Sequence, residues 1–327
     1  MRYIIYSFLL LFIFSCSLVK KEDKDNSGTL ALLALLASSS QAAGSTLTTL
    51  PAQKSRDTVL SEYNSRYVAS KVESFTWNGS TSSCTAGTVP SDVQTKVQVR
   101  INYFRGAVGL PDISLDSSLS AKAQEAALMM EANNSLNHNP PTSWTCYTTT
   151  GKDAAGASNL ALGAANSSAI DLYIQDPGSS NYAAGHRRWV LYSKAKLFGS
   201  GSTSKANALY VIGNSLTSYP ETMPDFISWP PQGYVVQSLV YDRWSFAIPE
   251  ADFSSVSVNM SSSDGTSISL TKETLAKGYG DNTLVWVPSG INKTSSTDLT
   301  YKVTISGVKL KDGTSKDYSY SVTLIKP

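Results

Sequence analysis

Only two histidines, His138 and His186, and three cysteines occur among the 327 residues of the chain. So small a set excludes zinc-finger arrays, iron–sulfur clusters and haem attachment motifs, which need more ligands or closely spaced ones. A metal site would therefore have to use His138, His186 or carboxylates. No serine stands in a Gly-x-Ser-x-Gly sequence, so a serine hydrolase would lack the turn that exposes its nucleophile.

Two amphipathic helices are predicted on either side of Gly109. Each has apolar residues at intervals of three and four, and the second begins after Asp116, a residue type that caps helices. The two apolar stripes are Val93, Val97, Ile101, Phe104 and Val108, then Leu119, Ala123, Ala126, Ala127 and Met130. The sequence NHNPP at 137–141 cannot stay helical, because proline disfavours the helical conformation in the residue before it. His138 is therefore expected at a helix end or in a loop.

Several short motifs follow one another between about residues 93 and 213. They are RINYFR at 100–105, VGLP at 108–111, LD at 115–116, AQEAA at 123–127, HNP at 138–140, GASNLA at 156–161, GHRRWVL at 185–191, GSG at 199–201 and ALYV at 208–211. In this order they resemble the CAP superfamily, also called SCP-like extracellular proteins. The resemblance implies an α/β/α sandwich around an antiparallel sheet.

The resemblance also implies a cavity with two histidines and two acidic residues, which in some members hold a divalent metal. Position by position, His138 and His186 match the histidines, and Asp176 matches the acidic residue ahead of the second one, where glutamate is more common. Asn159 belongs to the motif that resembles Gly-Glu-Asn-Leu, and Ser158 stands where its glutamate would be. A hydroxyl is a weak metal ligand and no general base at neutral pH.

Two interpretations of this cavity stay open. Two neutral imidazoles and one carboxylate, from His138, His186 and Asp176, would be a three-ligand set for Zn²⁺ with water in the fourth place, and such a site can hydrolyse substrates. Alternatively, both histidines are hydrogen-bonded pocket residues without a metal. The loss of one carboxylate at Ser158 favours binding over catalysis.

The residues expected near the cavity can also be interpreted in two ways. Arg187 and Arg188 suit an anionic group of a ligand, or they support the fold through carbonyls and acids such as Asp171 or Asp176. The aromatic residues of the loops around the cleft form either a ligand wall or ordinary packing. These aromatic residues are Trp144, Tyr147, Tyr173 and Tyr182.

The N-terminus has the pattern of an export signal. After Met1 and Arg2, residues 3–14 are apolar, and FIFSC at 12–16 resembles a loose bacterial lipobox in which Cys16 becomes the acylated first residue. Alternatively, the signal is cut elsewhere and Cys16 is discarded. Residues 17–60 are interpreted as a spacer and linker. Their apolar stretch at 29–37 is too short to span a bilayer and is either a surface-lying segment or a short packed helix.

Cys84 and Cys146 remain as an even pair once Cys16 is set aside. Disulfides persist in the compartments to which exported proteins are sent. We therefore expect these two residues to be bonded, the alternative being two separate thiols.

From Phe226 the pattern changes to short alternating segments with turns between them. The expected strands lie at 244–248, 256–260, 267–270, 283–287, 301–305 and 318–324. They predict an immunoglobulin-like β-sandwich, and this region resembles the C-terminal β domain of some bacterial CAP-like modules. Asp281 and Asn282 suit either calcium or a hairpin turn. The Trp229-Pro230-Pro231 element is either a flexible linker or a packed joint.

The predicted fold class is therefore α+β, an α/β/α CAP domain followed by an all-β immunoglobulin-like sandwich. The predicted divisions are a signal peptide with lipobox at 1–16, a spacer at 17–60, the CAP domain at 61–222 and the β domain at 226–327. A formal charge of +2 without a long basic run excludes nucleic acid as the expected partner.

The leading functional hypothesis is an exported lipoprotein, anchored at the outer membrane or cell surface through Cys16. Its CAP domain would bind an apolar ligand, a sterol or a fatty acid, or a partner protein, without catalysis. One alternative is a metal-dependent hydrolase that uses His138, His186 and Asp176. Another is an adhesin that binds host matrix through the β domain.

Overall fold

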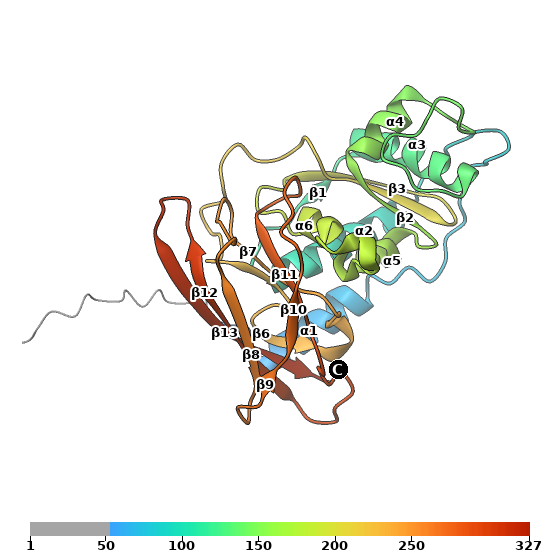
Figure 1. The fold of residues 1–327 in the computed structure, drawn as a ribbon. Coiled ribbons are helices and arrows are strands. Elements are labelled where there is room, and N and C mark those ends of the chain that lie inside the picture. Colours follow the sequence, from blue (N-terminus) through green and yellow to red (C-terminus); the bar gives the residue numbers. More distant parts are fainter. Residues whose placement is uncertain (1–52) are drawn as a thin grey trace, which may run out of the picture. The chain divides into compact units, whose positions relative to one another are not determined.

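The structure, a computed structural model, describes residues 53–327, which belong to one compact unit (Figure 1). The predicted signal peptide at 1–16, Cys16 and the spacer up to residue 52 lie outside the described residues. Within the expected linker, residues from Arg56 onward are helical: α1 spans Arg56–Glu62 and continues into a π-helical segment, Tyr63–Val68. In the part of the chain described, no helix is long and apolar enough to cross a membrane.

Helices cover both faces of a four-stranded sheet in the first region. The strands are β1 (Ser114–Leu115), β3 (Leu197–Ser202), β4 (Ala206–Tyr210) and β2 (Ser158–Leu162), in the order β1-β3-β4-β2. The pair β1 and β3 is parallel and the other pairs are antiparallel, so the sheet is not antiparallel throughout as expected. Between β1 and β3 the chain passes through α3, α4, β2, α5 and α6, and a long connection of this kind can bring two strands together in parallel.

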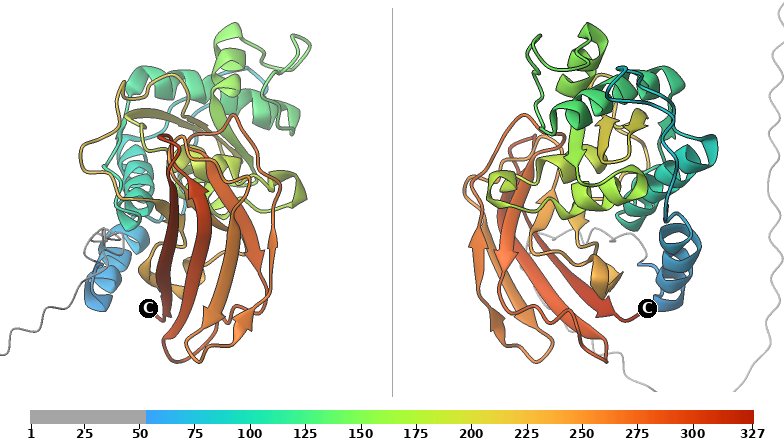
Figure 2. Two further views of the ribbon diagram at one scale, coloured as in Figure 1. Left: turned by 60° about the vertical axis from the view of Figure 1, so that its left-hand side comes forward. Right: turned by 90° about the vertical axis from the view of Figure 1, so that its right-hand side faces the viewer.

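Two helices pack on one face of this sheet and two on the other (Figures 1 and 2). One face carries α3 (Ser117–Asn133) and α4 (Thr149–Gly156); the other carries α2 (Ser91–Ala107) and α5 (Asn166–Gln175), followed by α6 (Gly185–Val190). The two amphipathic helices predicted from spacing are confirmed as α2 and α3. Asp116 caps α3, because its Oδ1 accepts a hydrogen bond from the Leu119 amide at 2.8 Å.

The C-terminal region is β-rich, as expected, and forms two sheets. One has the order β10-β11-β7-β5 and contains Leu270–Lys272, Thr283–Pro288, Trp244–Ala247 and Ile227–Trp229. The other has the order β6-β13-β12-β8-β9 and contains Gly233–Val236, Ser315–Ile325, Leu299–Lys309, Ser257–Ser262 and Ser267–Ile268. The strand expected at 267–270 is split into β9 and β10, which pair in different sheets.

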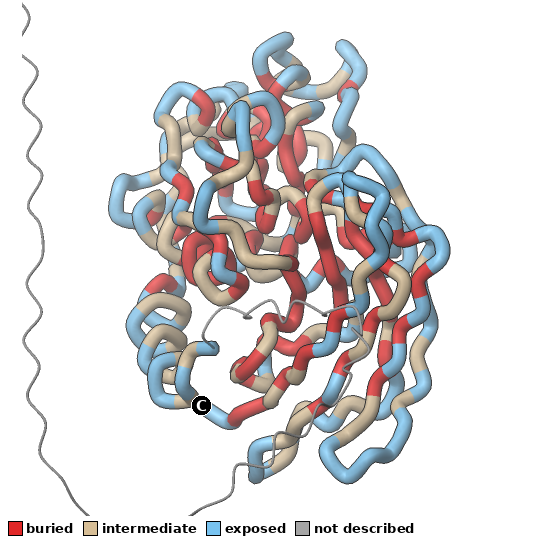
Figure 3. Tube along the Cα trace, turned by 90° about the vertical axis from the view of Figure 1, so that its left-hand side faces the viewer, coloured by how far each residue is buried: buried red, intermediate tan, exposed pale blue. Residues whose placement is uncertain are grey.

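One hydrophobic core runs through both regions (Figure 3). Trp229, 1% exposed, packs its ring against Phe104 of α2 with the ring centroids 5.2 Å apart. The element that contains Trp229 is thus a packed joint and not a flexible linker.

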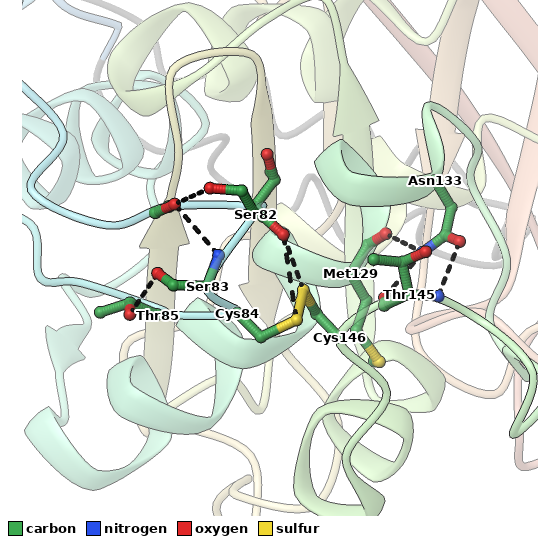
Figure 4. Close-up of a disulfide and its surroundings, with 10 residues drawn as sticks. Ser82, Ser83, Cys84, Thr85, Met129, Asn133, Thr145 and Cys146 are labelled. Carbon is green, nitrogen blue, oxygen red and sulfur yellow. Dashed lines mark hydrogen bonds between the residues drawn. A yellow bond between two sulfur atoms is a disulfide. The ribbon is translucent and has the colours of Figure 1, made fainter.

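The predicted disulfide between Cys84 and Cys146 is present and closes a sequence separation of 62 residues (Figure 4). Next to it, Asn133 at the end of α3 exchanges hydrogen bonds with the backbone of Thr145: its Oδ1 accepts from the Thr145 amide and its Nδ2 donates to the Thr145 carbonyl, each at 3.0 Å. These contacts anchor the end of the α3–α4 loop, which carries His138. For the 62-residue loop that the disulfide closes, the chain-entropy model gives about 4 kcal/mol of stabilisation.

Glycines let α3 lie directly on strand β3. A Cβ atom at Gly201 would lie 2.2 Å from the Gln124 amide nitrogen, and one at Gly199 would lie 2.3 Å from the Leu119 carbonyl carbon. Backbone atoms cannot move aside as a side-chain end can, so any larger residue here separates the helix from the sheet.

We predict that Gly201→Ala lowers the free energy of unfolding by about 3 kcal/mol, the upper end of the overpacking range. Gly106→Ala in α2 is the matched control, because a Cβ there meets only the end of the Arg66 side chain at 3.4 Å. The control should leave stability unchanged or raise it by up to about 1 kcal/mol. Urea unfolding of both variants tests this, and equal stabilities would contradict the close-packing argument.

Candidate functional site

The two histidines line one cavity of about 300 Å³ together with Ser158 and Asn159. His138 lies in the loop after α3, His186 is the second residue of α6, and Ser158 and Asn159 begin β2. The remaining lining includes Gly185, Trp189, Ile212, Gly278 and Tyr279. The structure therefore brings four of the five predicted cavity residues to a common wall.

Asp176, the fifth, lies behind His186 and is fully buried. Its Oδ1 lies 2.7 Å from His186 Nδ1, and its Oδ2 accepts from the backbone amides of His186 at 2.9 Å and Arg187 at 3.3 Å. A carboxylate accepts hydrogen bonds, so the proton belongs on His186 Nδ1. Asp176 ends α5 in the left-handed conformation with φ of 51°, which aspartate tolerates better than most residues.

Tyr173 of α5 supports the His186 ring from inside the fold. The two rings are stacked with centroids 5.6 Å apart and an interplanar angle of 25°. The buried Tyr173 hydroxyl donates to Asn207 Oδ1 at 2.9 Å, and burial raises the pKa of this hydroxyl well above its ordinary value. Tyr173 is therefore a support for the histidine and not part of the cavity wall.

His138 is oriented in the same way by a different acceptor. Its Nδ1 lies 2.9 Å from the Ala155 carbonyl oxygen in α4, and because a carbonyl only accepts, Nδ1 carries the proton. His138 is exposed and lines the cavity. In both imidazoles, then, Nδ1 is bonded to the protein and Nε2 is the nitrogen left for a ligand.

The donor set does not fit a three-ligand zinc site. Both carboxylate oxygens of Asp176 are used behind His186, so Asp176 is the partner of that imidazole and not a third ligand beside it. Ser158 supplies only a hydroxyl, a buried oxygen to which no described residue is hydrogen-bonded. Across residues 53–327, no group of three or more His, Cys, Asp or Glu side chains is placed to hold a metal ion.

Arg187 and Arg188 lie inside the fold, at 1% and 5% exposure, and do not line the cavity. Arg187 donates to the carbonyls of Ile174 at 2.7 Å and Arg243 at 2.9 Å. Burial lowers the pKa of each guanidinium to about 10. Asp171, considered as a partner, pairs with Arg100 instead.

The loop with Asp281 and Asn282 is a joint between the two regions. Asp281 accepts from the Ser193 amide and hydroxyl, each at 2.8 Å, and burial raises the pKa of its carboxyl. Asn282 Nδ2 donates to the Ala251 carbonyl at 2.8 Å. Both side chains are therefore engaged within the fold.

The aromatic lining differs from the expected one. Trp144 and Tyr147 pack on the cluster between α3 and α4, and Tyr182 does not line the cavity. The lining aromatics are Trp189 and Tyr279. Trp189 is part of the second histidine motif, so the sequence placed it near the site. Tyr279 lies in the β-rich region, where the residues around it predicted a turn and nothing more.

Comparison with known proteins gives one result for this part of the chain. Residues 99–215 match the family model of CAP, the cysteine-rich secretory protein family. This range contains both histidines, Ser158 and Asp176, and the family suggests an extracellular, binding type of function. No curated protein and no solved structure matches the chain significantly.

We predict that Asp176→Asn moves the His186 proton. The amide nitrogen of asparagine can donate to Nδ1, which would then accept, so the imidazole would carry its proton on Nε2. With only two histidines in the chain, ¹⁵N chemical shifts of the imidazoles resolve both. His138, bonded to a carbonyl, should remain protonated on Nδ1, and an unchanged His186 in the variant would contradict the assigned geometry.

Proposed function

Because residues 99–215 form a CAP family domain, we propose that this protein binds a ligand in the cavity between His138 and His186 without catalysis. The ligand is an apolar molecule with a small polar head, a sterol or a fatty acid, or an equivalent side chain of a partner protein. One observation carries the proposal: both imidazoles are fixed through Nδ1 and leave Nε2 free.

The polar end of the cavity suits a hydroxyl or carboxyl head. In these tautomers Nε2 of a neutral imidazole accepts a hydrogen bond, and after protonation it donates one to a carboxylate. Ser158 is 4% exposed, and its hydroxyl has no hydrogen-bond partner among residues 53–327. A buried hydroxyl without a partner is unfavourable, so a ligand that bonds to it gains free energy.

Part of the remaining wall, which also includes Ser180 and Asn181, suits an apolar body. Ala183, Trp189, Ile212 and Tyr279 contribute aliphatic and aromatic surface next to the polar end. Ligand sites commonly combine such apolar walls with a few polar groups that fix orientation.

The hydrolase alternative has less support. A catalytic zinc ion takes three protein ligands, and here the carboxylate of Asp176 lies behind an imidazole. Ser158 in place of a glutamate also leaves no carboxylate on the cavity wall to act as a base.

The proposal includes export and anchoring. The N-terminal sequence supports a signal peptide and an acylated Cys16, with the outer membrane or cell surface as location. The Cys84–Cys146 bond is of the kind that persists in oxidising compartments. The two C-terminal sheets support an immunoglobulin-like sandwich for residues 226–327.

We predict that palmitate or cholesterol binds the protein in the presence of EDTA. The His138→Ala/His186→Ala variant should bind about thirtyfold more weakly, since each of the two lost hydrogen bonds is worth about 1 kcal/mol. Calorimetric titration measures both affinities. Tyr182→Ala is the control, because Tyr182 lies outside the cavity lining.

Equal affinities in the double variant and the unmodified protein would contradict the proposed site. Ester hydrolysis that EDTA abolishes and the double variant lacks would replace the binding proposal by the hydrolase alternative.

A further inference from the structure

The cavity of the CAP family domain is completed from outside that domain. The family match ends at residue 215, yet Gly278 and Tyr279 line the cavity from the loop between β10 and β11. We infer that the C-terminal β-rich region sets access to the cavity through the ring of Tyr279, which narrows the mouth next to His186. The inference rests on the proposed function, because the ring affects function only if a ligand enters the cavity past it.

The Tyr279 ring lies directly against the start of α6. A Cβ atom at Gly185 would be 2.8 Å from both Cδ1 and Cε1 of Tyr279, closer than side chains approach one another. Gly185 therefore provides the space in which the ring lies. The next residue in the chain is His186, so the ring and the imidazole belong to adjoining parts of one wall.

A single buried guanidinium holds the loop on both sides of Tyr279. Arg188 donates through Nη1 to the Ala276 carbonyl and through Nη2 to the Asp281 carbonyl, each at 3.0 Å. Its Cζ atom also lies 5.3 Å from the Tyr279 ring centroid. Because Arg188 and His186 share the short helix α6, the ring and the imidazole are fixed to the same element.

The loop backbone next to Tyr279 also lies close against α6 and the residues that follow it. Gly280 approaches α6 so nearly that a Cβ atom there would lie 2.6 Å from the Arg188 carbonyl oxygen. The Asp281 carboxylate is bonded to Ser193, just beyond α6. The position of Tyr279 thus follows from contacts on both sides and not from its own packing alone.

Exposure indicates how the two histidines differ. The His186 side chain is 26% exposed, whereas His138 is more exposed and its Nδ1 is bonded to α4. Tyr279 is itself 39% exposed, with part of its ring open to solvent. Removing the ring should therefore uncover His186 and leave His138 as it was.

The rate at which diethyl pyrocarbonate modifies each imidazole tests this inference without any ligand. The chain contains only two histidines, so mass spectrometry of two peptides follows each one separately. We expect Tyr279→Ala to raise the rate at His186 several-fold and leave the rate at His138 unchanged. Tyr279→Phe, which keeps the ring, should behave as the unmodified protein.

Tyr182→Ala is the matched control, because Tyr182 is also 39% exposed but does not line the cavity. An unchanged His186 rate in Tyr279→Ala would overturn the inference. A parallel rise at both histidines would overturn it too, because it would mean that the ring only stabilises the fold. If the unmodified protein binds neither palmitate nor cholesterol, the proposed function is contradicted. The result on the access of diethyl pyrocarbonate to His186 would still be valid.

Discussion

Two buried guanidinium groups, on Arg187 and Arg188, require hydrogen-bond acceptors inside the fold. A buried charge must be hydrogen-bonded, because leaving it without partners costs several kcal/mol. Carbonyl groups from both regions supply these partners. Ile174 of α5 and Arg243, just before β7, accept from Arg187, and the β10–β11 loop supplies the acceptors for Arg188. Helix α6 is thereby fixed to both regions at once.

The cavity follows from the position of α6. His186 immediately precedes the two arginines, and the same segment donates backbone amides to Asp176, whose other oxygen faces the imidazole. Arg243 of the β-rich region adds a bond to the Asp176 carbonyl at 2.8 Å. The orientation of one cavity histidine therefore depends on the CAP family domain and on the C-terminal region together. That dependence explains why a residue as distant in sequence as Tyr279 lies in the cavity wall.

Sequence reasoning succeeded where local pattern determines structure. Apolar spacing located α2 and α3, Asp116 identified a cap, and the parity of the cysteines in an exported chain predicted the disulfide. The pairing of His138 with His186 came from the resemblance of motifs, since no spacing rule links residues so far apart.

The features that the sequence did not predict depend on contacts between distant segments of the chain. Strands β5 and β6 are too short and too close to prolines to show alternation, and the strand at 267–270 changes sheets at Ser269. Asp176 was expected beside the histidines, but an acidic residue can coordinate a metal or orient an imidazole, and only tertiary geometry distinguishes these. Tyr279 gave no signal because its role comes from Gly185 and Arg188, which lie in another region.

The buried arginines join the CAP family domain and the β-rich region into one cooperative structure with one composite cavity. Hydrogen exchange by mass spectrometry, measured across a urea titration, tests it by following peptides from residues 99–215 and from residues 226–327 separately. Both sets of peptides should lose protection at the same urea concentration. Protection that persists in the β-rich region after the CAP family domain has unfolded would contradict it.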